Sequence, residues 1–380
     1  MVEPTEVDDL LLVLSYYSPY VSGLTNVARD IAEGLAARGR RVRVITTQHD
    51  PRLPRDEVLN GVQVERAPVV MRFGKGAISP TLIRRVTRAS KSARVLNLHL
   101  PMLEAGLIAR RSSIPTVVSY HCDVSLPEGL VNGLQRRAID GSSRQAMKAA
   151  KKIVVTSEDY ARHSRLAAHM MEKAVVIPPP CHQHPAGSPS FRQTDGLHIG
   201  FLGRIVEEKG LEYLVEAFRR SADPDARLLI GGEFANIAGH SVVERVKSRI
   251  GNDPRVTLLG FIDDDLIPDF YASIDLFALP SINAFEAFGI VQVEAMMAGV
   301  PVLASDLPGV RVPVQETGMG EIAAPGDPNS IERSIRSLLE TPPNCAEGRA
   351  RAVSLYAAER IIDQYDNLIA SFPPGLVPSR

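Results

Sequence analysis

Two glutamates, Glu286 and Glu294, carry the strongest chemical signal in the sequence, and seven residues separate them. An apolar, strand-like run at 276–279 precedes them, and a helical pattern begins between them, at about residue 290. Free backbone N–H groups at a helix N-terminus, together with the helix dipole, favour an anion. Glu294 would lie about 7 Å along that helix, where a carboxylate can accept hydrogen bonds from vicinal sugar hydroxyls. Either glutamate alone could be a solvated surface residue, but the helix start between them favours a binding site.

Two cations, Arg204 and Lys209, directly follow a second strand-like run, 198–202. A diphosphate leaving group gains negative charge as its bond to a sugar breaks. An arginine fork and a lysine point charge can neutralise that charge without a metal ion. Alone, two such residues could be solvated bystanders. Their place between a strand and the helical pattern at 211–220 favours a phosphate site.

Two residues in the first half of the chain are weaker candidates. Gly23 lies between the first strand and the first helix, where glycine lets the backbone approach a phosphate or a sugar, although it could equally be a turn glycine. His121 follows the strand-like run 116–120. A lone histidine is more often structural, but a place at the carboxyl end of a strand favours a role in ligand binding.

These candidates need a scaffold, and the apolar periodicity predicts one. Strands are expected at 10–16, 42–46, 62–66, 95–98, 116–120 and 153–156, then at 198–202, 227–230, 256–259, 276–279 and 302–304. Helices are expected at 24–35, 102–111, 133–151, 211–220, 242–250, 267–273, 290–297, 328–340 and about 346–370. Strands alternating with helices indicate βαβ units and parallel sheets. The predicted fold is α/β, with two doubly wound Rossmann-like domains facing a central cleft that holds the site.

The length of 380 residues favours two domains, because single cores rarely grow beyond roughly 250–300 residues. The expected boundaries give an acceptor-side domain at 1–185 and a nucleotide-sugar domain at 186–355. A C-terminal helix at 356–380 is expected to pack back towards the first domain. The three prolines at 178–180 and the polar run to about 196 are expected to form a linker with nothing to bury.

Composition and charge exclude several classes of protein. The chain is 44% hydrophobic and 23% charged, unlike disordered or fibrous proteins. Its three scattered cysteines form neither a disulfide framework nor a metal-ligand spacing, which suits a reducing cytosol. Apolar runs are far shorter than the ~20 residues of a membrane span. Residues 1–185 carry 26 Lys/Arg and 17 Asp/Glu, a charge of +9, and the remainder carries −10.

Segment 72–94 concentrates this positive charge, with seven cations and no acidic residue. The cations are Arg72, Lys75, Arg84, Arg85, Arg88, Lys91 and Arg94. Within 81–91 they oppose apolar residues on an amphipathic helical pattern. The segment could be a solvated face, or it could dock on an anionic membrane or a lipid-phosphate acceptor. The expected location is the cytoplasm, with possible peripheral contact at the inner membrane face.

Taken together and in this order, Gly23, His121, the Arg204 and Lys209 cations, and the paired glutamates resemble the retaining glycosyltransferases of family 4, which have the GT-B fold. The resemblance runs from the first strand to about residue 340. It implies that Arg204 and Lys209 bind the donor diphosphate and that Glu294 binds the nucleotide ribose. Glu286, with backbone at Phe288, Gly289 and Ile290, would hold the transferred sugar and the phosphates. His121 would face the donor sugar near the reaction centre. Ser22 stands where the family usually has a first of two glycines.

The function implied is retaining transfer of a hexose from a UDP- or GDP-sugar to a hydroxyl acceptor. That acceptor could be lipid-linked, a cell-surface glycan or a secondary metabolite. The resemblance implies no enzymic nucleophile, and the departing phosphate would deprotonate the acceptor on the same face. No cofactor, metal ion or nucleic-acid partner is expected, and the aspartates at 263–265 are interpreted as helix caps rather than magnesium ligands. Alternatives are a sugar-nucleotide epimerase of similar fold and a non-catalytic donor-binding subunit. The sequence has no Gly-x4-Gly-Lys phosphate-binding loop. It also has no Gly-x-Gly-x-x-Gly after the first strand, which weakens a dehydrogenase interpretation.

Overall fold

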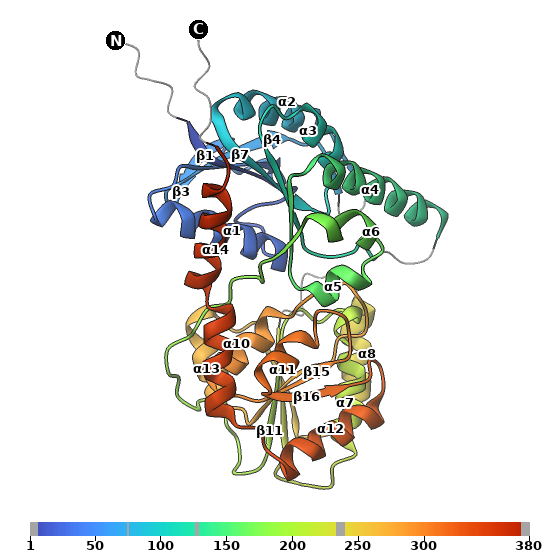
Figure 1. Cartoon of the computed structure of the whole chain (residues 1–380). Coiled ribbons are helices and arrows are strands. Elements are labelled where there is room, and N and C mark those ends of the chain that lie inside the picture. The colour runs from blue at the N-terminus through green and yellow to red at the C-terminus, as the bar shows by residue number, and fades with distance from the viewer. Residues whose placement is uncertain (1–6, 74–75, 126–128, 233–239, 374–380) are drawn as a thin grey trace. The chain divides into compact units, whose positions relative to one another are not determined.

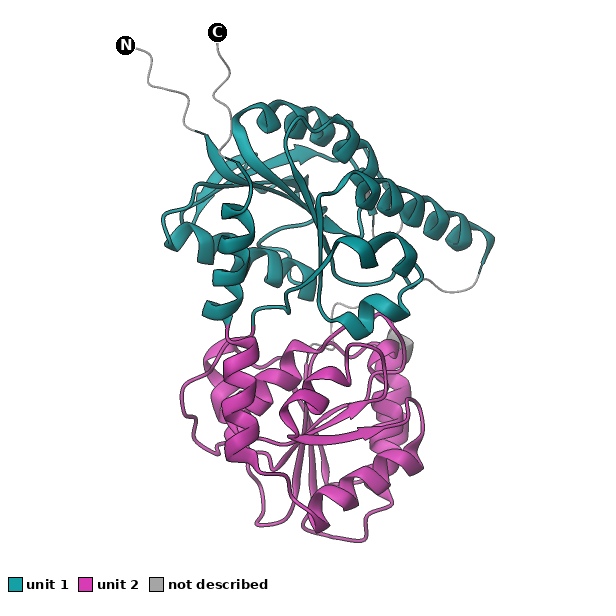
Figure 2. Ribbon diagram, viewed as in Figure 1, with its two compact units in different colours: residues 1–180, 358–380 teal, residues 181–357 magenta. Residues whose placement is uncertain are grey.

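The computed structural model describes residues 7–73, 76–125, 129–232 and 240–373. It divides into two compact units, coloured separately in Figure 2. Unit 1 comprises Met1–Pro180 and Ala358–Arg380, and unit 2 comprises Cys181–Ala357. The divisions therefore fall after Pro180 and Ala357, whereas the sequence analysis placed them at 185/186 and 355/356.

Unit 1 is built on an eight-stranded sheet in the order β10-β9-β8-β7-β1-β2-β4-β3, parallel except for the β3–β4 pair. Leu10 to Leu14, in and after the central strand, are all at most 1% exposed, because helices cover both faces of a parallel sheet. The strands are β1 (Asp8–Val13), β2 (Val42–Gln48), β3 (Asp56–Leu59), β4 (Val62–Pro68), β7 (Ala93–Leu100), β8 (Thr116–Tyr120), β9 (Lys152–Val155) and β10 (Ala174–Val176), with a separate ribbon of β5 (Met71–Phe73) and β6 (Gly76–Ile78).

The helices of unit 1 are labelled in Figure 1 and come from both ends of the chain. They are α1 (Gly23–Ala37), α2 (Pro80–Ala89), α3 (Ala105–Arg111), α4 (Leu130–Ala149), α5 (Glu158–His163), α6 (Ala167–Met170) and α14 (Ala358–Ala370), with short 3-10 turns η1 (Ser90–Ser92) and η2 (Met171–Lys173). Helix α14 packs on α1. Arg40 binds Asp366 of α14 at 2.6 Å, so the C-terminal helix belongs to this unit.

Unit 2 is built on a six-stranded parallel sheet in the order β13-β12-β11-β14-β15-β16. Its strands are β11 (His198–Leu202), β12 (Arg227–Gly231), β13 (Val256–Gly260), β14 (Leu276–Leu279), β15 (Val302–Ser305) and β16 (Gly320–Ala323). Its helices are η3 (Glu207–Lys209), α7 (Leu211–Arg219), α8 (His240–Ile250), η4 (Asp264–Leu266), α9 (Ile267–Ala272), α10 (Ile290–Ala298), α11 (Val312–Thr317), α12 (Pro328–Glu340) and α13 (Cys345–Tyr356).

Each sheet contains one point at which the strand order reverses. In unit 2 the chain runs outward from β11 through β12 and β13, then returns to place β14 on the other side of β11. In unit 1 the same reversal lies between β1 and β7. Loops that leave such neighbouring strands diverge to opposite faces, so a crevice opens at their carboxyl ends.

Two expectations about the second half of the chain are wrong. The helix expected at 346–370 is two helices, because Ala357 has extended backbone (φ −55°, ψ 135°) and pairs with Cys181 in an isolated bridge. The run after the prolines does bury side chains. Phe191 packs on Phe270 of α9, with ring centroids 6.3 Å apart, and the Ser188 N–H donates to Asp269 at 2.7 Å. These partners lie about 80 residues away in sequence, where local composition gives no sign of them.

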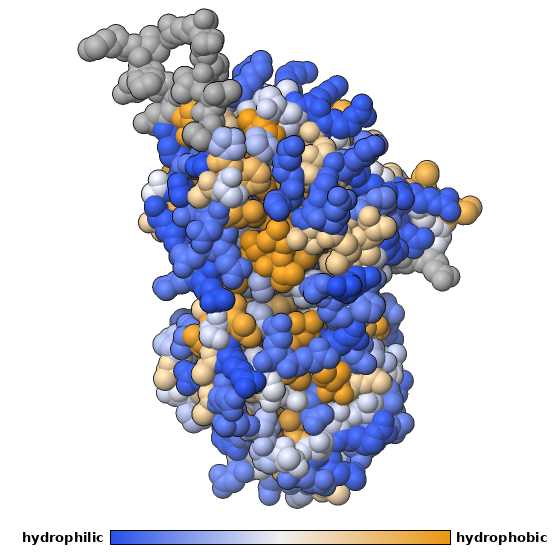
Figure 3. Space-filling model, viewed as in Figure 1, coloured by the Kyte–Doolittle hydropathy of each residue, from blue (hydrophilic) through white to orange (hydrophobic). Residues whose placement is uncertain are grey.

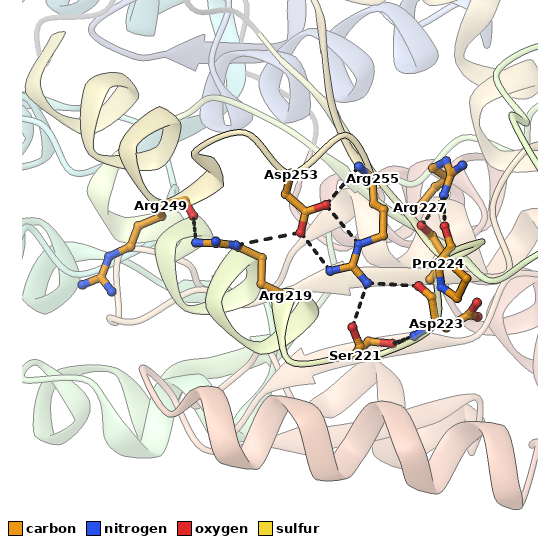
Figure 4. A network of polar contacts seen from close by, with 9 residues as sticks. Arg219, Ser221, Asp223, Pro224, Arg227, Arg249, Asp253 and Arg255 are labelled. Atoms are coloured by element: carbon orange, nitrogen blue, oxygen red, sulfur yellow. Dashed lines mark hydrogen bonds and ion pairs between the residues drawn. The ribbon is translucent and has the colours of Figure 1, made fainter.

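The amino end of the unit 2 sheet is tied together by arginines (Figure 4). Arg255, just before β13, donates to both carboxylate oxygens of Asp253 at 3.0 and 2.8 Å. It also donates to the carbonyls of Ser221 and Asp223 at 2.7 and 3.0 Å. Arg219 of α7 donates to the Arg249 carbonyl of α8 at 2.7 Å. The network joins the ends of two helices to the sheet, at the edge opposite the predicted site.

Candidate active site

Lys209 and Glu286 form an ion pair at the strand-order reversal of unit 2. Lys209 ends η3, in the loop that leaves β11, and Glu286 lies in the loop that leaves the neighbouring strand β14. The Ser281 hydroxyl donates to the same Glu286 oxygen, Oε2, at 3.4 Å. Both charged side chains are largely buried, with 17% and 16% exposed. The structure therefore brings together one cation and one carboxylate that the sequence analysis selected separately.

The two loops approach each other closely at Gly210. The Ile282 N–H donates to the Glu208 carbonyl at 2.9 Å, which links the loop after β14 to the loop after β11. Gly210 has φ +62°, and a Cβ there would lie 2.2 Å from the Pro280 carbonyl oxygen. No side chain fits in that space. The glycine after Lys209 thus allows the contact that sets Lys209 beside Glu286.

Arg204 occupies the same loop but is not part of this pair. Its side chain is 47% exposed and lies 3.8 Å from Glu208, four residues further along the chain. An ion pair of that length and exposure contributes little to stability. The guanidinium is therefore free to reorient towards an anion without a large loss of folding free energy.

Helix α10 begins at the end of the Glu286 loop with its first N–H groups uncapped. Gly289 is its N-cap (φ +82°), and no side-chain capping bond forms there. A Cβ on Gly289 would lie 2.3 Å from Leu279 Cδ2. The buried Gln292 amide donates to the carbonyls of Phe288 and Val310. These hydrogen bonds hold the end of the Glu286 loop against the core. N–H groups presented in this way are a typical anion site.

Phe288 and Ile290 flank Gly289, and their side chains pack against the core of unit 2. The Phe288 side chain is 3% exposed and packs edge-on against Tyr356, with ring centroids 5.4 Å apart. Ile290 packs partly against the same core. Their side chains anchor the loop, which leaves their peptide groups at the helix start.

Glu294 lies one turn into α10 and has neighbours that the sequence analysis missed. The Tyr271 hydroxyl of α9 lies 3.4 Å from Glu294 Oε2 and 3.1 Å from the Val291 carbonyl. Nε2 of His184 lies 3.9 Å from the same carboxylate oxygen. Burial, followed by the charge of Glu294, raises the pKa of Tyr271 well above its usual range. The tyrosine is therefore neutral, and its single hydroxyl proton is shared between the nearer Val291 carbonyl and the carboxylate.

In unit 1, Gly23 is the first residue of α1 and Ser22 is its N-cap. The Ser22 hydroxyl accepts a hydrogen bond from the Thr25 N–H at 3.2 Å, which gives a physical reason for serine at the position where a first glycine was anticipated. A Cβ on Gly23 would meet no heavy atom within 4 Å. Packing inside the unit therefore does not require glycine at this position.

His121 directly follows β8 and contacts a second histidine, His99 of β7. His121 Nε2 lies 2.9 Å from His99 Nδ1, and the rings stack with centroids 5.0 Å apart. Burial lowers the pKa of His121 to about 4. His99 was not selected from the sequence, although it stands at the carboxyl end of the strand next to β8, which is the same signal that selected His121.

Two further predictions require correction or qualification. Asp263 occupies the N-cap position of η4, but its side chain makes no capping hydrogen bond. In the basic segment, Leu82 and Val86 of α2 are at most 1% exposed, because α2 packs on β2 and β4. The apolar side of α2 therefore packs in the core, and Arg84 and Arg88 of α2 and Lys91 of η1 are exposed. Lys75 lies outside the described residues.

Comparison with known proteins gives two family matches and many relatives. The chain matches the glycosyl transferase 4-like domain at residues 22–180 and the glycosyl transferases group 1 domain at 189–354. It is 28% identical over 357 residues to 2-deoxystreptamine glucosyltransferase of Streptomyces kanamyceticus, which covers 84% of this chain and 90% of the relative. It is 28% identical over 346 residues to phosphatidyl-myo-inositol mannosyltransferase of Mycobacterium leprae, covering 86% of each.

Solved structures agree on the fold. Sucrose-phosphate synthase of Thermosynechococcus elongatus superposes with a TM-score of 0.74 at 21% identity, covering 95% of this chain and 98% of that one. HepE of Anabaena, solved in complex with UDP-glucose, gives 0.72 at 20% identity, covering 95% and 99%. The predicted fold class, a GT-B pair of doubly wound α/β units, is confirmed.

Proposed function

Since the chain belongs to the glycosyl transferases group 1 family and is a glycosyltransferase, we propose that it moves a hexose-type sugar from a UDP- or GDP-sugar to a hydroxyl acceptor. The transfer would retain the configuration of the anomeric carbon and need no metal ion. The observation that carries this proposal is the Lys209–Glu286 pair at the strand-order reversal of unit 2. Glu286 lies in the loop that leads to the uncapped start of α10.

When the donor binds, Lys209 exchanges its ion pair with Glu286 for one with the donor diphosphate. A diphosphate offers Lys209 more negative charge than one carboxylate, and Arg204 can swing to join it. N–H groups at Gly289 and Ile290 would bind a phosphate oxygen. Glu286 is then released to accept hydrogen bonds from hydroxyls of the transferred sugar, and Glu294 accepts them from the ribose. UDP-glucose bound in HepE of Anabaena supports a nucleotide-sugar donor.

In the reaction, the bond between the anomeric carbon and the diphosphate oxygen breaks, and a bond to the acceptor oxygen forms on the same face. The acceptor proton passes to the departing phosphate, so the products are the glycoside and a nucleoside diphosphate. Lys209 and Arg204 offset the charge that grows on the leaving group, which is where fixed cations contribute most to rate. His121 of unit 1 would contact the transferred sugar.

The acceptor is proposed to be anionic or to be presented at an anionic surface, because the first half of the chain is basic. Unit 1 has a cavity of about 390 Å³ beyond the ends of β2 and β4, within the usual size of a ligand pocket. Its lining includes Gln48, Met71 and Arg72. Arg72 supplies a positive charge there, as a phosphate or carboxylate on an acceptor would require.

Peripheral membrane contact is a second part of this proposal, with the enzyme in the cytoplasm. Cys122, Cys181 and Cys345 form no disulfide, as in a reducing compartment. Among the described residues, none of the helices combines the length and apolarity needed to cross a bilayer. Exposed apolar side chains gather instead on α4, at Leu130, Val131 and Leu134. The protruding end of that helix is orange in Figure 3. Equal recovery with neutral and anionic vesicles in a flotation assay would contradict contact through the basic segment 72–94, and no recovery with either would contradict membrane contact altogether.

The first experiment is a thermal-shift panel of nucleotide sugars. A donor at 100 times its Kd should add about 2.7 kcal/mol to stability. Transfer is then assayed in excess chelator with candidate acceptors, and NMR of the product reports the anomeric configuration. Strict dependence on Mg²⁺ or Mn²⁺ would contradict the assignment of Arg204 and Lys209. A changed sugar nucleotide without an acceptor would indicate an epimerase, and binding without any turnover would indicate a donor-binding subunit.

A further inference from the structure

A series of polar contacts crosses the interior of unit 1 and ends at His121. The Tyr365 hydroxyl of α14 lies 3.5 Å from Ser119 Oγ, and Asn97 Nδ2 donates to Ser119 Oγ at 3.0 Å. Asn97 Oδ1 lies 2.8 Å from His99 Nε2, and His99 Nδ1 lies 2.9 Å from His121 Nε2. Asn97, His99 and Ser119 are at most 2% exposed. We refer to these five residues as the buried array.

The proton positions in the buried array follow from what each atom can do. Asn97 Nδ2 lies 3.4 Å from the Val117 carbonyl, which can only accept, so the amide nitrogen faces that carbonyl and Oδ1 faces His99. An amide oxygen also only accepts, and His99 Nε2 must therefore carry a proton. Burial and the neighbouring His121 lower the pKa of His99 well below its usual range. His99 is thus neutral, and its Nδ1 has a lone pair.

His121 is constrained in turn by that lone pair. A hydrogen bond between His99 Nδ1 and His121 Nε2 now requires the proton to be on His121 Nε2. Because the pKa of His121 is about 4, the ring is uncharged at neutral pH and has no second proton. Its Nδ1 atom is left as an acceptor. A neutral acceptor suits a sugar hydroxyl and offers no attraction to a phosphate.

We propose that His99, oriented by Asn97, is a positioning residue that holds His121 as the neutral Nε2–H tautomer, so that Nδ1 of His121 accepts a hydrogen bond from a hydroxyl of the bound sugar. The sugar contact rests on the proposed function, whereas the tautomer does not. The array lies beside a cavity of about 10 Å³ lined in part by Ser119, His121 and Tyr365. That volume has room for one water molecule at most.

The tautomer is tested directly by NMR of the full chain labelled with ¹⁵N-histidine. The His121 ring signals are identified by their loss in His121→Gln. Wild type should show a protonated Nε2 and a bare Nδ1 at neutral pH. In His99→Leu, which has no acceptor for Nε2–H, both tautomers of His121 should be populated. A protonated Nδ1 in wild type, or an unchanged single tautomer in His99→Leu, overturns the proposal.

Kinetics separate positioning from a merely structural role. His99→Leu should lower kcat about fivefold to tenfold, the scale of one neutral hydrogen bond. In His99→Gln, a side-chain oxygen can again accept the His121 proton, and kcat should return to within about twofold of wild type. Equal losses in the two variants overturn the positioning role. Unchanged kcat in His121→Ala overturns the sugar contact.

A milder variant keeps the test usable if His99→Leu does not fold. Asn97→Ala leaves both histidines in place but removes the acceptor for His99 Nε2–H, so each ring can carry its proton on either nitrogen. Mixed tautomers at His121 in Asn97→Ala support the proposal, and a single tautomer contradicts the role of Asn97. This NMR readout needs no turnover. If the wild-type protein transferred no sugar, the proposed function would be contradicted, but the tautomer of His121 could still be measured.

Discussion

Each of the two edges of the unit 2 sheet, at the amino and the carboxyl ends of its strands, has an ion pair between a cation and a carboxylate. The two pairs differ in how many hydrogen bonds they make. At the amino edge, Arg255 satisfies Asp253 through two hydrogen bonds and two backbone carbonyls through two more. At the carboxyl edge, and among the residues that the structure describes, Lys209 Nζ donates to Glu286 alone. Exposure does not distinguish the pairs, since Arg255 and Asp253 are 14% and 11% exposed and Lys209 and Glu286 are 17% and 16%.

The difference lies in how many hydrogen-bonding positions are filled. The Arg255 guanidinium has four fixed acceptors and therefore stabilises the fold. Exchanging any of these acceptors would leave a buried polar group without a hydrogen bond. An ammonium with one carboxylate partner keeps two N–H groups for another acceptor. Incomplete satisfaction of largely buried charges is therefore what we expect at the edge proposed to bind the donor, and variants at the two edges should separate activity from stability.

The largest effect is expected for Lys209→Ala. Loss of the cation that meets the leaving group should reduce turnover by about 100-fold or more. Thermal unfolding should change less than in Arg255→Ala, because Lys209 donates to Glu286 alone, whereas Arg255 has four acceptors. Lys247→Ala is the matched control, because Lys247 is an exposed lysine of the same unit paired with Glu244 at 3.1 Å. Similar activities of Lys209→Ala and Lys247→Ala would contradict the proposed role of Lys209 in the site.

Glu286→Ala should reduce turnover on the same scale, and the double variant should add little to it. The two residues act on one bound donor, and effects within such a unit are strongly non-additive. The three variants are compared by kcat/KM for one donor. Losses that multiply in the double variant would show that Lys209 and Glu286 serve separate steps.

At the opposite edge, Arg255→Ala should reduce stability and leave turnover intact. Removing hydrogen bonds to a largely buried carboxylate costs about 2 kcal/mol, which lowers Tm by about 4–8 °C for a unit of this size. Differential scanning calorimetry and an assay at 20 °C check the two halves of this prediction. A fall in kcat comparable to that of Lys209→Ala would contradict the inference that the amino edge serves stability rather than activity.

Glu294→Gln should act mainly on donor affinity. Exchanging a carboxylate for an amide weakens hydrogen bonds from the ribose hydroxyls, and KM for the donor should rise about tenfold. Tyr271→Phe serves as the control, since it removes a hydroxyl 3.4 Å from the carboxylate and leaves the charge. An equal fall of kcat with unchanged KM would contradict the ribose assignment.

The smallest effect concerns acid pH at the amino edge. Hydrogen bonds from Arg255 hold the pKa of Asp253 below its ordinary value of 3.8. The stability gained is fully present above the unfolded pKa and is lost as pH falls through the lower, folded pKa. The difference in urea midpoint between wild type and Arg255→Ala should therefore shrink between pH 6 and pH 3. A difference independent of pH would show that Asp253 is not the group concerned.

Local pattern was sufficient to place several of the proposed site residues in their elements. Apolar runs followed by turn-forming and charged residues located the loops after β11 and β14, and with them Lys209 and Glu286. It was insufficient for residues whose partners are distant in sequence. His184 and Tyr271 carry no motif, and their place beside Glu294 depends on how α9 and the run after Pro180 pack on unit 2.

The sequence by itself determined the α/β class, the alternation of strands and helices, and the glycines within the loops after β11 and β14, because each depends on neighbours within a few residues. Tertiary structure alone decided that β14 lies beside β11, and hence that Lys209 meets Glu286 across 77 residues. It also decided that His99 meets His121 and that α14 joins unit 1. Strand order and helix docking are set by the burial of whole elements against one another, and periodicity within one element contains no information about its partner.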